Sequence, residues 1–336
     1  MRMRLPLLVS TIVAVIGFGA TLPGCAGAED SVSFDTSVNS APDVFTASQP
    51  NPRFTSALDV PSEGKGRSFG CLKKRAAGGD AGATQVKKLL SGGLERDYRV
   101  HVSARLPGDS PLPVVLAFHG RGSRGADIEA ASGLLPVSDR EGFLLVSPDG
   151  TGSPRAWGAG ASMSNWPVDD VAFVNGLLDR LETDFCVDTT RIYAVGYSNG
   201  GFLASRLACA LGGRLAAIVP VAGLSMPAEP CGGAVAVLAI HGTADEVVPF
   251  NGGAVRTVYK YAGVRAVLAG WSLLNGCGGA PSIQRLSPRA VREEQHGCRR
   301  PVSLVSLAGR GHEWPVDADF KVAETIWAFL KDQHSA

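Results

Sequence analysis

The sequence lacks a C-x-x-C pair, an H-E-x-x-H motif and any long run of charge of one sign. Without the first two there is no recognisable dithiol or zinc motif, and we expect neither a metal nor another cofactor. Charged residues make up 19% of the 336 residues and the formal net charge is +1, so nothing indicates a nucleic acid as partner. Internal repeats and coiled-coil heptads are also absent. One folded domain of about 260 residues fits this length and composition best.

The amino end has the pattern of an export signal. A basic start, "MRMR", is followed by the apolar stretch 5–22 and by "PGC", which ends at Cys25. Leu22 and Gly24 precede Cys25 as in a bacterial lipobox, in which the cysteine is lipidated and becomes the mature N-terminus. An ordinary cleaved signal and an uncleaved membrane anchor are the alternatives. Each places the body outside the cytoplasm, either lipid-anchored to the cell envelope or secreted.

The chain after this signal (1–25) divides into two parts. Residues 26–69 are rich in Ser, Ala, Pro and Asp and show no periodicity, which is typical of a flexible linker. Residues 70–336 carry the apolar patterns of a folded domain. We expect this domain to be a monomer, with the membrane contacted only through a lipid anchor.

Six cysteines remain in the body, an even number in an oxidising compartment, which predicts three disulfides. Cys277 and Cys298 enclose a polar, proline-containing stretch and are expected to pair. Cys186 precedes a strand and Cys209 lies near the far end of the following helix, so both should reach the same end of the sheet. Pairing these two leaves Cys71 for Cys231.

Short apolar runs alternate with helical patterns along most of the body. An expected hairpin comes first, with "ATQVKKLL" and "LERDYRVHVSARL" on either side of a glycine turn. The runs that follow are "PVVLAFHG", "FLLVSPDG", "RIYAVGYS", "LAAIVPVAG", "AVAVLAIHG" and "PVSLVSLAG". Nearly continuous apolar runs of this length are typical of parallel strands covered on both faces. One connecting helix begins near Asp170, which is expected on its exposed side. The sequence predicts an α/β fold with a mostly parallel central sheet and helices on both faces.

Two segments match Gly-x-Ser-x-Gly, and only one has the right surroundings. In "YAVGYSNGGF", Ser198 follows an apolar run and precedes a helical pattern. That strand–turn–helix context exposes a serine hydroxyl at a tight corner. In "GRSFG", Ser68 has neither a strand before it nor a helix after it. We therefore predict that Ser198 is the nucleophile.

A serine nucleophile needs a histidine to take its proton and a carboxylate to orient that histidine. Asp245, in "HGTADEVVPF", is the one aspartate between Ser198 and His312, and it lies just beyond an apolar run. Glu246 is its near rival. His312, in "GRGHEWP", follows the last apolar run and is predicted to be the base.

Other polar residues at the ends of these apolar runs are expected to support the reaction without acting as nucleophile, acid or base. His119 and His241 sit in His-Gly pairs and are expected to form structural hydrogen bonds. The backbone N–H groups of Asn199 and Arg121 are predicted to form the oxyanion hole, with glycines on both sides of Arg121 freeing that loop.

These segments together resemble the secreted feruloyl esterases, acetylxylan esterases and polyhydroxybutyrate depolymerase-like enzymes. The resemblance runs from about Cys71 to the C-terminus and rests above all on "CVDTTRIYAVGYSNGG" with "HGTADEVVPF". It implies a single-domain α/β-hydrolase with Ser198, Asp245 and His312 as its triad. Arg121 departs from the pattern, since an apolar residue is commoner there.

The resemblance implies an exported serine esterase acting on plant cell-wall polysaccharide esters, most closely a feruloyl esterase. A polyhydroxybutyrate depolymerase or an acetylxylan esterase is the first alternative. A serine peptidase or a non-catalytic binding lipoprotein fits these motifs less well. A feruloyl group needs a flat apolar slot, and Trp314, Trp157 and Trp166 are the candidate walls because all three lie in loops at the expected catalytic edge.

Overall fold

The computed structural model describes residues 66–72, 81–105, 110–159, 168–226, 230–255, 259–316 and 318–335. All of them lie within the unit Asp59–Ala336. The predicted signal segment with Cys25, the predicted linker up to residue 65, and Trp166 lie outside the described residues.

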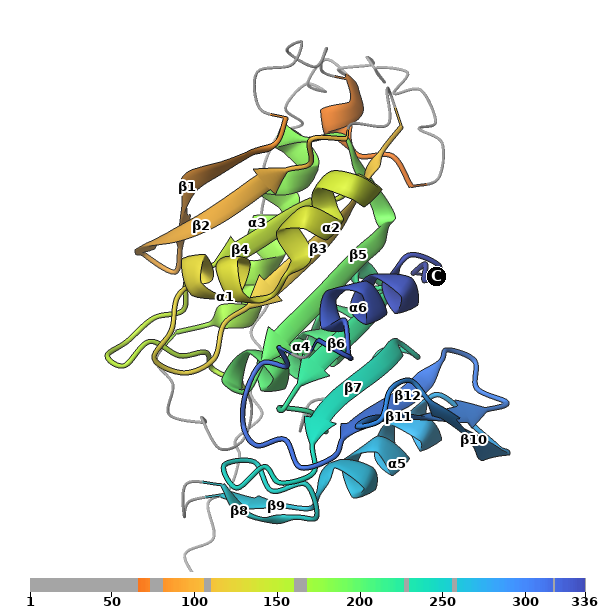
Figure 1. Cartoon of the computed structure of the whole chain (residues 1–336). Coiled ribbons are helices and arrows are strands. Elements are labelled where there is room, and N and C mark those ends of the chain that lie inside the picture. Colours follow the sequence, from red (N-terminus) through yellow and green to blue (C-terminus); the bar gives the residue numbers. More distant parts are fainter. Residues whose placement is uncertain are drawn as a thin grey trace, which may run out of the picture. The chain divides into compact units, whose positions relative to one another are not determined.

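A ten-stranded sheet confirms the predicted architecture, with the order β1-β2-β4-β3-β5-β6-β7-β12-β11-β10 (Figure 1). Its six central strands, from β4 to β12, are parallel, and each edge carries an antiparallel pair. The strands are β1 (Ala83–Ser91), β2 (Leu94–Val102), β3 (Leu112–Phe118), β4 (Leu144–Pro148), β5 (Val187–Tyr197), β6 (Ala217–Val221), β7 (Ala236–Gly242), β10 (Gly279–Arg285), β11 (Ala290–His296) and β12 (Val302–Leu307). A separate small sheet pairs β8 (Gly253–Val255) with β9 (Tyr259–Tyr261). Strands β1 and β2 form the predicted hairpin.

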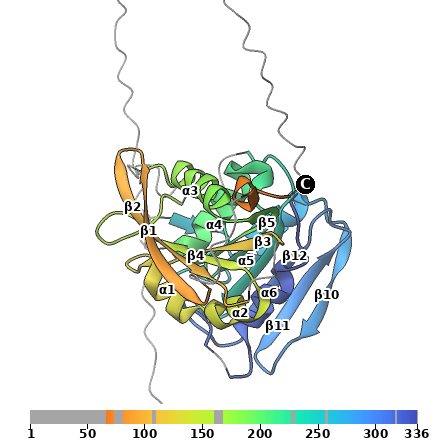
Figure 2. The ribbon, with the colours of Figure 1, turned by 90° about the horizontal axis from the view of Figure 1, so that it is seen from above.

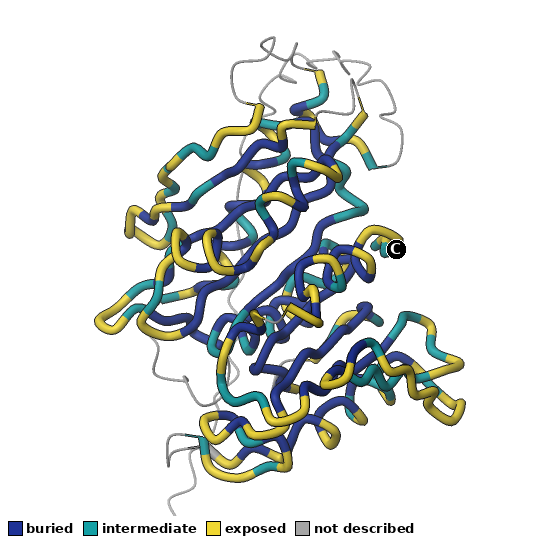
Figure 3. The backbone as a smooth tube through the Cα atoms, in the orientation of Figure 1, coloured by how far each residue is buried: buried dark blue, intermediate teal, exposed yellow. Residues whose placement is uncertain are grey.

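Side chains of the central strands alternate between two apolar clusters, one on each face of the sheet. In β3, Val114, Leu116 and Phe118 belong to one cluster, and Val115 and Ala117 belong to the other. The central strands are buried along most of their length, and only β5 contains half-buried residues (Figure 3). Burial on both faces explains why these strands appear in the sequence as continuous apolar runs.

Helices cover both faces of the sheet (Figure 2). They are α1 (Gly125–Ala131), α2 (Leu134–Glu141), α3 (Asp170–Asp184), α4 (Asn199–Ala210), α5 (Val264–Leu274) and α6 (Val322–Leu330), with short 3-10 turns η1 (Phe69–Leu72) and η3 (Gly212–Arg214). Helices α3, α4 and α5 pack in the first cluster, and α1, α2 and α6 pack in the second. Among the described residues, no helix combines the length and the apolar character needed to span a membrane.

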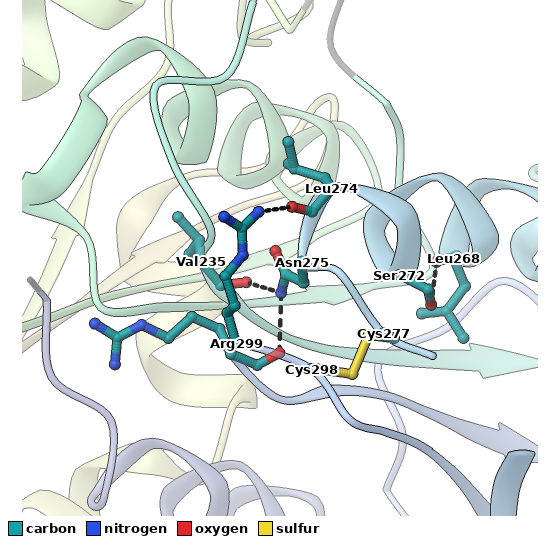
Figure 4. Close-up of a disulfide and its surroundings, with 9 residues drawn as sticks. Val235, Leu268, Ser272, Leu274, Asn275, Cys277, Cys298 and Arg299 are labelled. Atoms are coloured by element: carbon teal, nitrogen blue, oxygen red, sulfur yellow. Dashed lines mark hydrogen bonds between the residues drawn. A yellow bond between two sulfur atoms is a disulfide. The ribbon is translucent and has the colours of Figure 1, made fainter. Parts of the chain in front are cut away.

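The stretch between Cys277 and Cys298 forms the hairpin β10–β11, which extends the sheet. Every residue of β10 is exposed, and β11 is only half-buried, so neither strand has an apolar run in the sequence. Arg265 on α5 forms an ion pair with Glu293 on β11. Figure 4 shows the Cys277–Cys298 disulfide at the base of the hairpin, beside Asn275, whose Nδ2 donates to the backbone oxygen of Val235 at 2.7 Å.

All six body cysteines form disulfides, but two of the three predicted pairings are wrong. The structure confirms the pair of Cys277 and Cys298, and it joins Cys71 to Cys186 and Cys209 to Cys231.

The segment around Ser68 explains this difference. Ser68 Oγ donates to the backbone oxygen of Phe185 and accepts from the N–H of Val187, each at 2.9 Å. Residues 66–69, at the end of the predicted linker, thus lie along the start of β5 and carry Cys71 to Cys186. No apolar run marks this segment, so the sequence did not place it against β5.

Candidate active site

Ser198 stands at a strained corner between β5 and α4. Its φ of +53° is a left-handed value, uncommon for a residue other than glycine. The glycines around it permit the corner, because a Cβ at Gly196 would lie 2.1 Å from the oxygen of Gly200, and a Cβ at Gly200 would lie 2.3 Å from the oxygen of Phe118. The predicted strand–turn–helix context of Ser198 is confirmed.

The structure brings Ser198, His312 and Asp245 together. Nε2 of His312 lies 2.8 Å from Oγ of Ser198, and Nδ1 lies 2.8 Å from Oδ2 of Asp245. The three residues come from the carboxyl ends of β5, β12 and β7. This geometry fits an imidazole that donates from Nδ1 to the carboxylate and accepts the serine proton at Nε2.

The Asp245 carboxylate is buried and strongly hydrogen-bonded. Its side chain has no exposed surface, and its Oδ1 accepts from the N–H groups of Val247 and Val248 at 2.9 and 2.8 Å. Burial opposes ionisation, but hydrogen bonds from His241, His312 and the backbone outweigh it and hold the pKa of Asp245 well below its ordinary value. Asp245 therefore stays ionised beside His312. Its rival in the sequence, Glu246, is exposed.

His241 forms the structural hydrogen bond predicted for it and also contacts the triad acid. Its Nε2 lies 2.9 Å from the backbone oxygen of Val248 and 3.3 Å from Oδ2 of Asp245. Because a carbonyl oxygen can only accept, Nε2 carries the hydrogen and faces both oxygens. The sequence did not predict this second contact.

The oxyanion site predicted from Asn199 and Arg121 lies beside Ser198. Asn199 is the first residue of α4, so its N–H has no acceptor within the helix. Arg121 follows Gly120, and a Cβ at Gly120 would lie 3.5 Å from Cβ of Ser198. The peptide that carries the Arg121 N–H therefore runs close to the serine. The side chain of Arg121 is exposed.

His119 fixes the loop that carries this peptide. Its Nδ1 lies 2.7 Å from the oxygen of Gly120, and its Nε2 accepts from the N–H of Gly150 at 2.9 Å. The first contact needs a hydrogen on Nδ1 and the second needs a bare Nε2, so the ring is neutral. Burial lowers the pKa of His119, which agrees with this assignment.

The tryptophans predicted to line an aryl slot are mostly buried. Trp157 has no exposed surface, and its indole N–H donates to the oxygen of His119 at 2.9 Å. Trp314 is 8% exposed and belongs to the second apolar cluster. Trp157 therefore supports its loop by packing and cannot contact a substrate, whereas Trp314 exposes only a small part of its surface. Trp166 lies outside the described residues.

The side chain of Asn199 provides a contact that the sequence did not predict. Its Oδ1 accepts from the N–H of Trp157 at 2.7 Å, and its Nδ2 donates to the oxygen of Trp157 at 3.1 Å. The loop after β4 is thus tied to the first turn of α4, next to Ser198.

A buried ion pair fastens the same loop from the other side. Nη1 of Arg96 lies 2.6 Å from Oδ1 of Asp170, and the two side chains are 2% and 0% exposed. Asp170 also accepts from the N–H of Gly158 at 2.6 Å, and Arg96 donates to the oxygen of Asp149 at 2.9 Å. The prediction that Asp170 faces solvent is wrong, because its position in the first turn of α3 turns it toward Arg96 on β2.

The known proteins that this chain resembles include several esterases. No family model matches the chain. Feruloyl esterase B of Piromyces equi is 28% identical over 242 residues, which cover 67% of this chain but only 42% of that protein. Feruloyl esterase C of Emericella nidulans is 27% identical over 245 residues, covering 70% of this chain and 83% of that protein. An acetyl xylan esterase from Aspergillus awamori has the same fold, with a TM-score of 0.59 at 12% identity, covering 74% of this chain and 99% of that one. The chain resembles feruloyl esterases in sequence and has the α/β-hydrolase fold, as the sequence predicted.

Proposed function

We propose that this protein is an exported serine esterase that hydrolyses carboxylic esters on plant cell-wall polysaccharides through an acyl-enzyme on Ser198. The observation that carries the proposal is the unbroken series of hydrogen bonds from Asp245 through His312 to Ser198. The sequence likeness to feruloyl esterases supports a feruloyl ester as the substrate.

The proposed reaction has two halves. His312 takes the proton of Ser198 as Oγ attacks the ester carbonyl, and the N–H groups of Asn199 and Arg121 stabilise the oxyanion. The bond between the carbonyl carbon and the sugar oxygen then breaks, His312 gives its proton to that oxygen, and the acyl group stays on Ser198. Water, activated by the same imidazole, releases the acid and restores the serine.

Substitution of Ser198 tests this proposal. Ser198→Ala should abolish hydrolysis of methyl ferulate, whereas Ser68→Ala should retain it in the folded fraction, because Ser68 bonds only to backbone at the start of β5. Equal losses in two folded variants would contradict the role of Ser198.

A substrate panel tests the acyl group. The wild-type enzyme is offered feruloyl, acetyl and hydroxybutyrate esters together with a peptide substrate. Methyl ferulate should give the highest kcat/KM. Activity on acetyl or hydroxybutyrate esters alone would replace the feruloyl proposal by one of those alternatives, and peptide cleavage without ester cleavage would reject the esterase.

We also propose that the protein leaves the cytoplasm and is lipidated on Cys25. Three disulfides fit an oxidising compartment. The lipobox-like residues before Cys25 supply the lipidation site. The native cell should incorporate labelled fatty acid into the wild-type protein and not into Cys25→Ser. Absence of label from the wild type would refute the anchor.

A further inference from the structure

We propose that Tyr197 is a positioning residue that holds His312 at the distance from Ser198 that proton transfer requires. The inference rests on the proposed function, because it assigns His312 as the base. Tyr197 is the last residue of β5 and directly precedes Ser198.

The Tyr197 side chain contacts both the backbone and the ring of His312. Its hydroxyl donates to the backbone oxygen of His312 at 2.9 Å. Its ring lies with its centroid 5.3 Å from that of the imidazole, at an interplanar angle of 32°. One side chain thus limits both the position of the loop and the orientation of the ring.

The main chain from His312 onward has little other support from hydrogen bonds. Within the part of the chain that the structure describes, the Tyr197 hydroxyl forms the one hydrogen bond that joins the main chain of 312–316 to a distant segment. Two residues before His312, the backbone oxygen of Arg310 accepts from the N–H of Ala244, just after β7, at 2.9 Å. Asp245 holds the ring of His312, and the restraint on its main chain comes from Tyr197.

The Tyr197 ring is itself held in place. A Cβ at Gly120 would lie only 2.9 Å from Cδ1 of Tyr197, so the oxyanion loop packs directly against the ring. Trp314 meets it edge-on, with centroids 6.4 Å apart and an angle of 82°. The ring is a rigid spacer between the oxyanion loop and the base loop. Burial raises the pKa of Tyr197 to about 12, so the hydroxyl keeps its hydrogen and donates throughout the neutral range.

Tyr197→Phe removes the hydroxyl and keeps the ring. Loss of one hydrogen bond to the base loop should lower kcat about five- to tenfold with KM unchanged. Tyr193→Phe is the matched control, because Tyr193 lies on the same strand and its hydroxyl donates to the backbone oxygen of Gln333, also at 2.9 Å. Tyr193→Phe should keep the wild-type kcat per folded molecule. Equal kcat values in the two variants would overturn the proposal.

A second background shows whether Tyr197 acts through His312. In a His312→Ala protein, adding Tyr197→Phe should change the residual rate by less than twofold, since the group that Tyr197 positions is gone. A full five- to tenfold loss in that background would overturn the proposal and assign the effect to the oxyanion loop.

The rate at which a fluorophosphonate labels Ser198 gives a readout independent of the natural substrate. Tyr197→Phe should slow labelling by the same factor as kcat, and Tyr193→Phe should not. If the wild-type enzyme is labelled but hydrolyses no ester of the panel, the substrate proposal fails while the role of Tyr197 is still measured. A Tyr197→Phe protein labelled at the wild-type rate would overturn that role.

Discussion

Replacing Asp245 by Asn changes one atom at the centre of the site and should lower kcat by about four powers of ten. The side-chain oxygen of the asparagine should take the place of Oδ1, because the atom there accepts from the N–H groups of Val247 and Val248. The amide nitrogen then takes the place of Oδ2, 2.8 Å from Nδ1 of His312. An amide nitrogen donates, so Nδ1 must accept and the ring hydrogen moves to Nε2.

That hydrogen faces Ser198, because Nε2 lies 2.8 Å from Oγ. The imidazole can then no longer accept the serine proton. A misplaced tautomer of this kind costs about 10⁴-fold in kcat, or about 5.4 kcal/mol of transition-state stabilisation. KM should hardly change, since Asp245 is buried and does not reach the substrate.

The assay is steady-state hydrolysis of methyl ferulate and an acetyl ester near neutral pH, with the folded fraction measured by circular dichroism. Glu246→Gln is the control, because Glu246 is the exposed neighbour and the rival acid in the sequence. Asp245→Asn activity within about tenfold of wild type would refute the tautomer argument. A loss of about 10⁴-fold in Glu246→Gln instead would assign the acid to Glu246.

Three other predictions concern stability and packing. Loop-closure entropy predicts that removal of the Cys71–Cys186 disulfide, whose sequence separation is 115, lowers the free energy of unfolding by about 5 kcal/mol. Removal of Cys277–Cys298, whose separation is 21, should lower it by about 3 kcal/mol. Chemical unfolding of the two variants that gave the reverse order would contradict this prediction. Because the pKa of His119 is lowered in the folded state, the unfolded state binds a proton on this residue more readily, and the free energy of unfolding should fall as the pH drops below about 6.5. The fall with pH should be shallower in His119→Asn. The same dependence of stability on pH in both proteins would reject the neutral ring. Trp314→Phe should reduce turnover of methyl ferulate and of acetyl esters by the same factor, because the indole is 8% exposed; a selective rise in KM for methyl ferulate would revive the aryl slot.

The parts of this fold that sequence could predict are those with a strong local pattern. The buried strands β3 to β7 and β12 give continuous apolar runs because both of their faces are covered. Ser198 could be separated from Ser68 because a strand and a helix flank only the former. Asp245 and His312 followed from their places at strand ends.

The parts that escaped prediction depend on contacts between distant segments. Strand β10 is exposed along its length, so its sequence has no apolar alternation. Asp170 resembles a helix-surface carboxylate until Arg96 is brought across from β2. The partner of Cys71 depends on Ser68 lying beside the start of β5, a contact with no local pattern.

Reaction of the wild-type protein with a fluorophosphonate, followed by peptide mapping, tests the central claim most directly. The probe should add once, on Ser198 in the peptide that contains "GYSNGG", and esterase activity should fall in proportion to labelling. His312→Ala should label far more slowly, because it lacks the group 2.8 Å from Oγ. An adduct on another residue, or full activity in protein labelled at Ser198, would contradict the account.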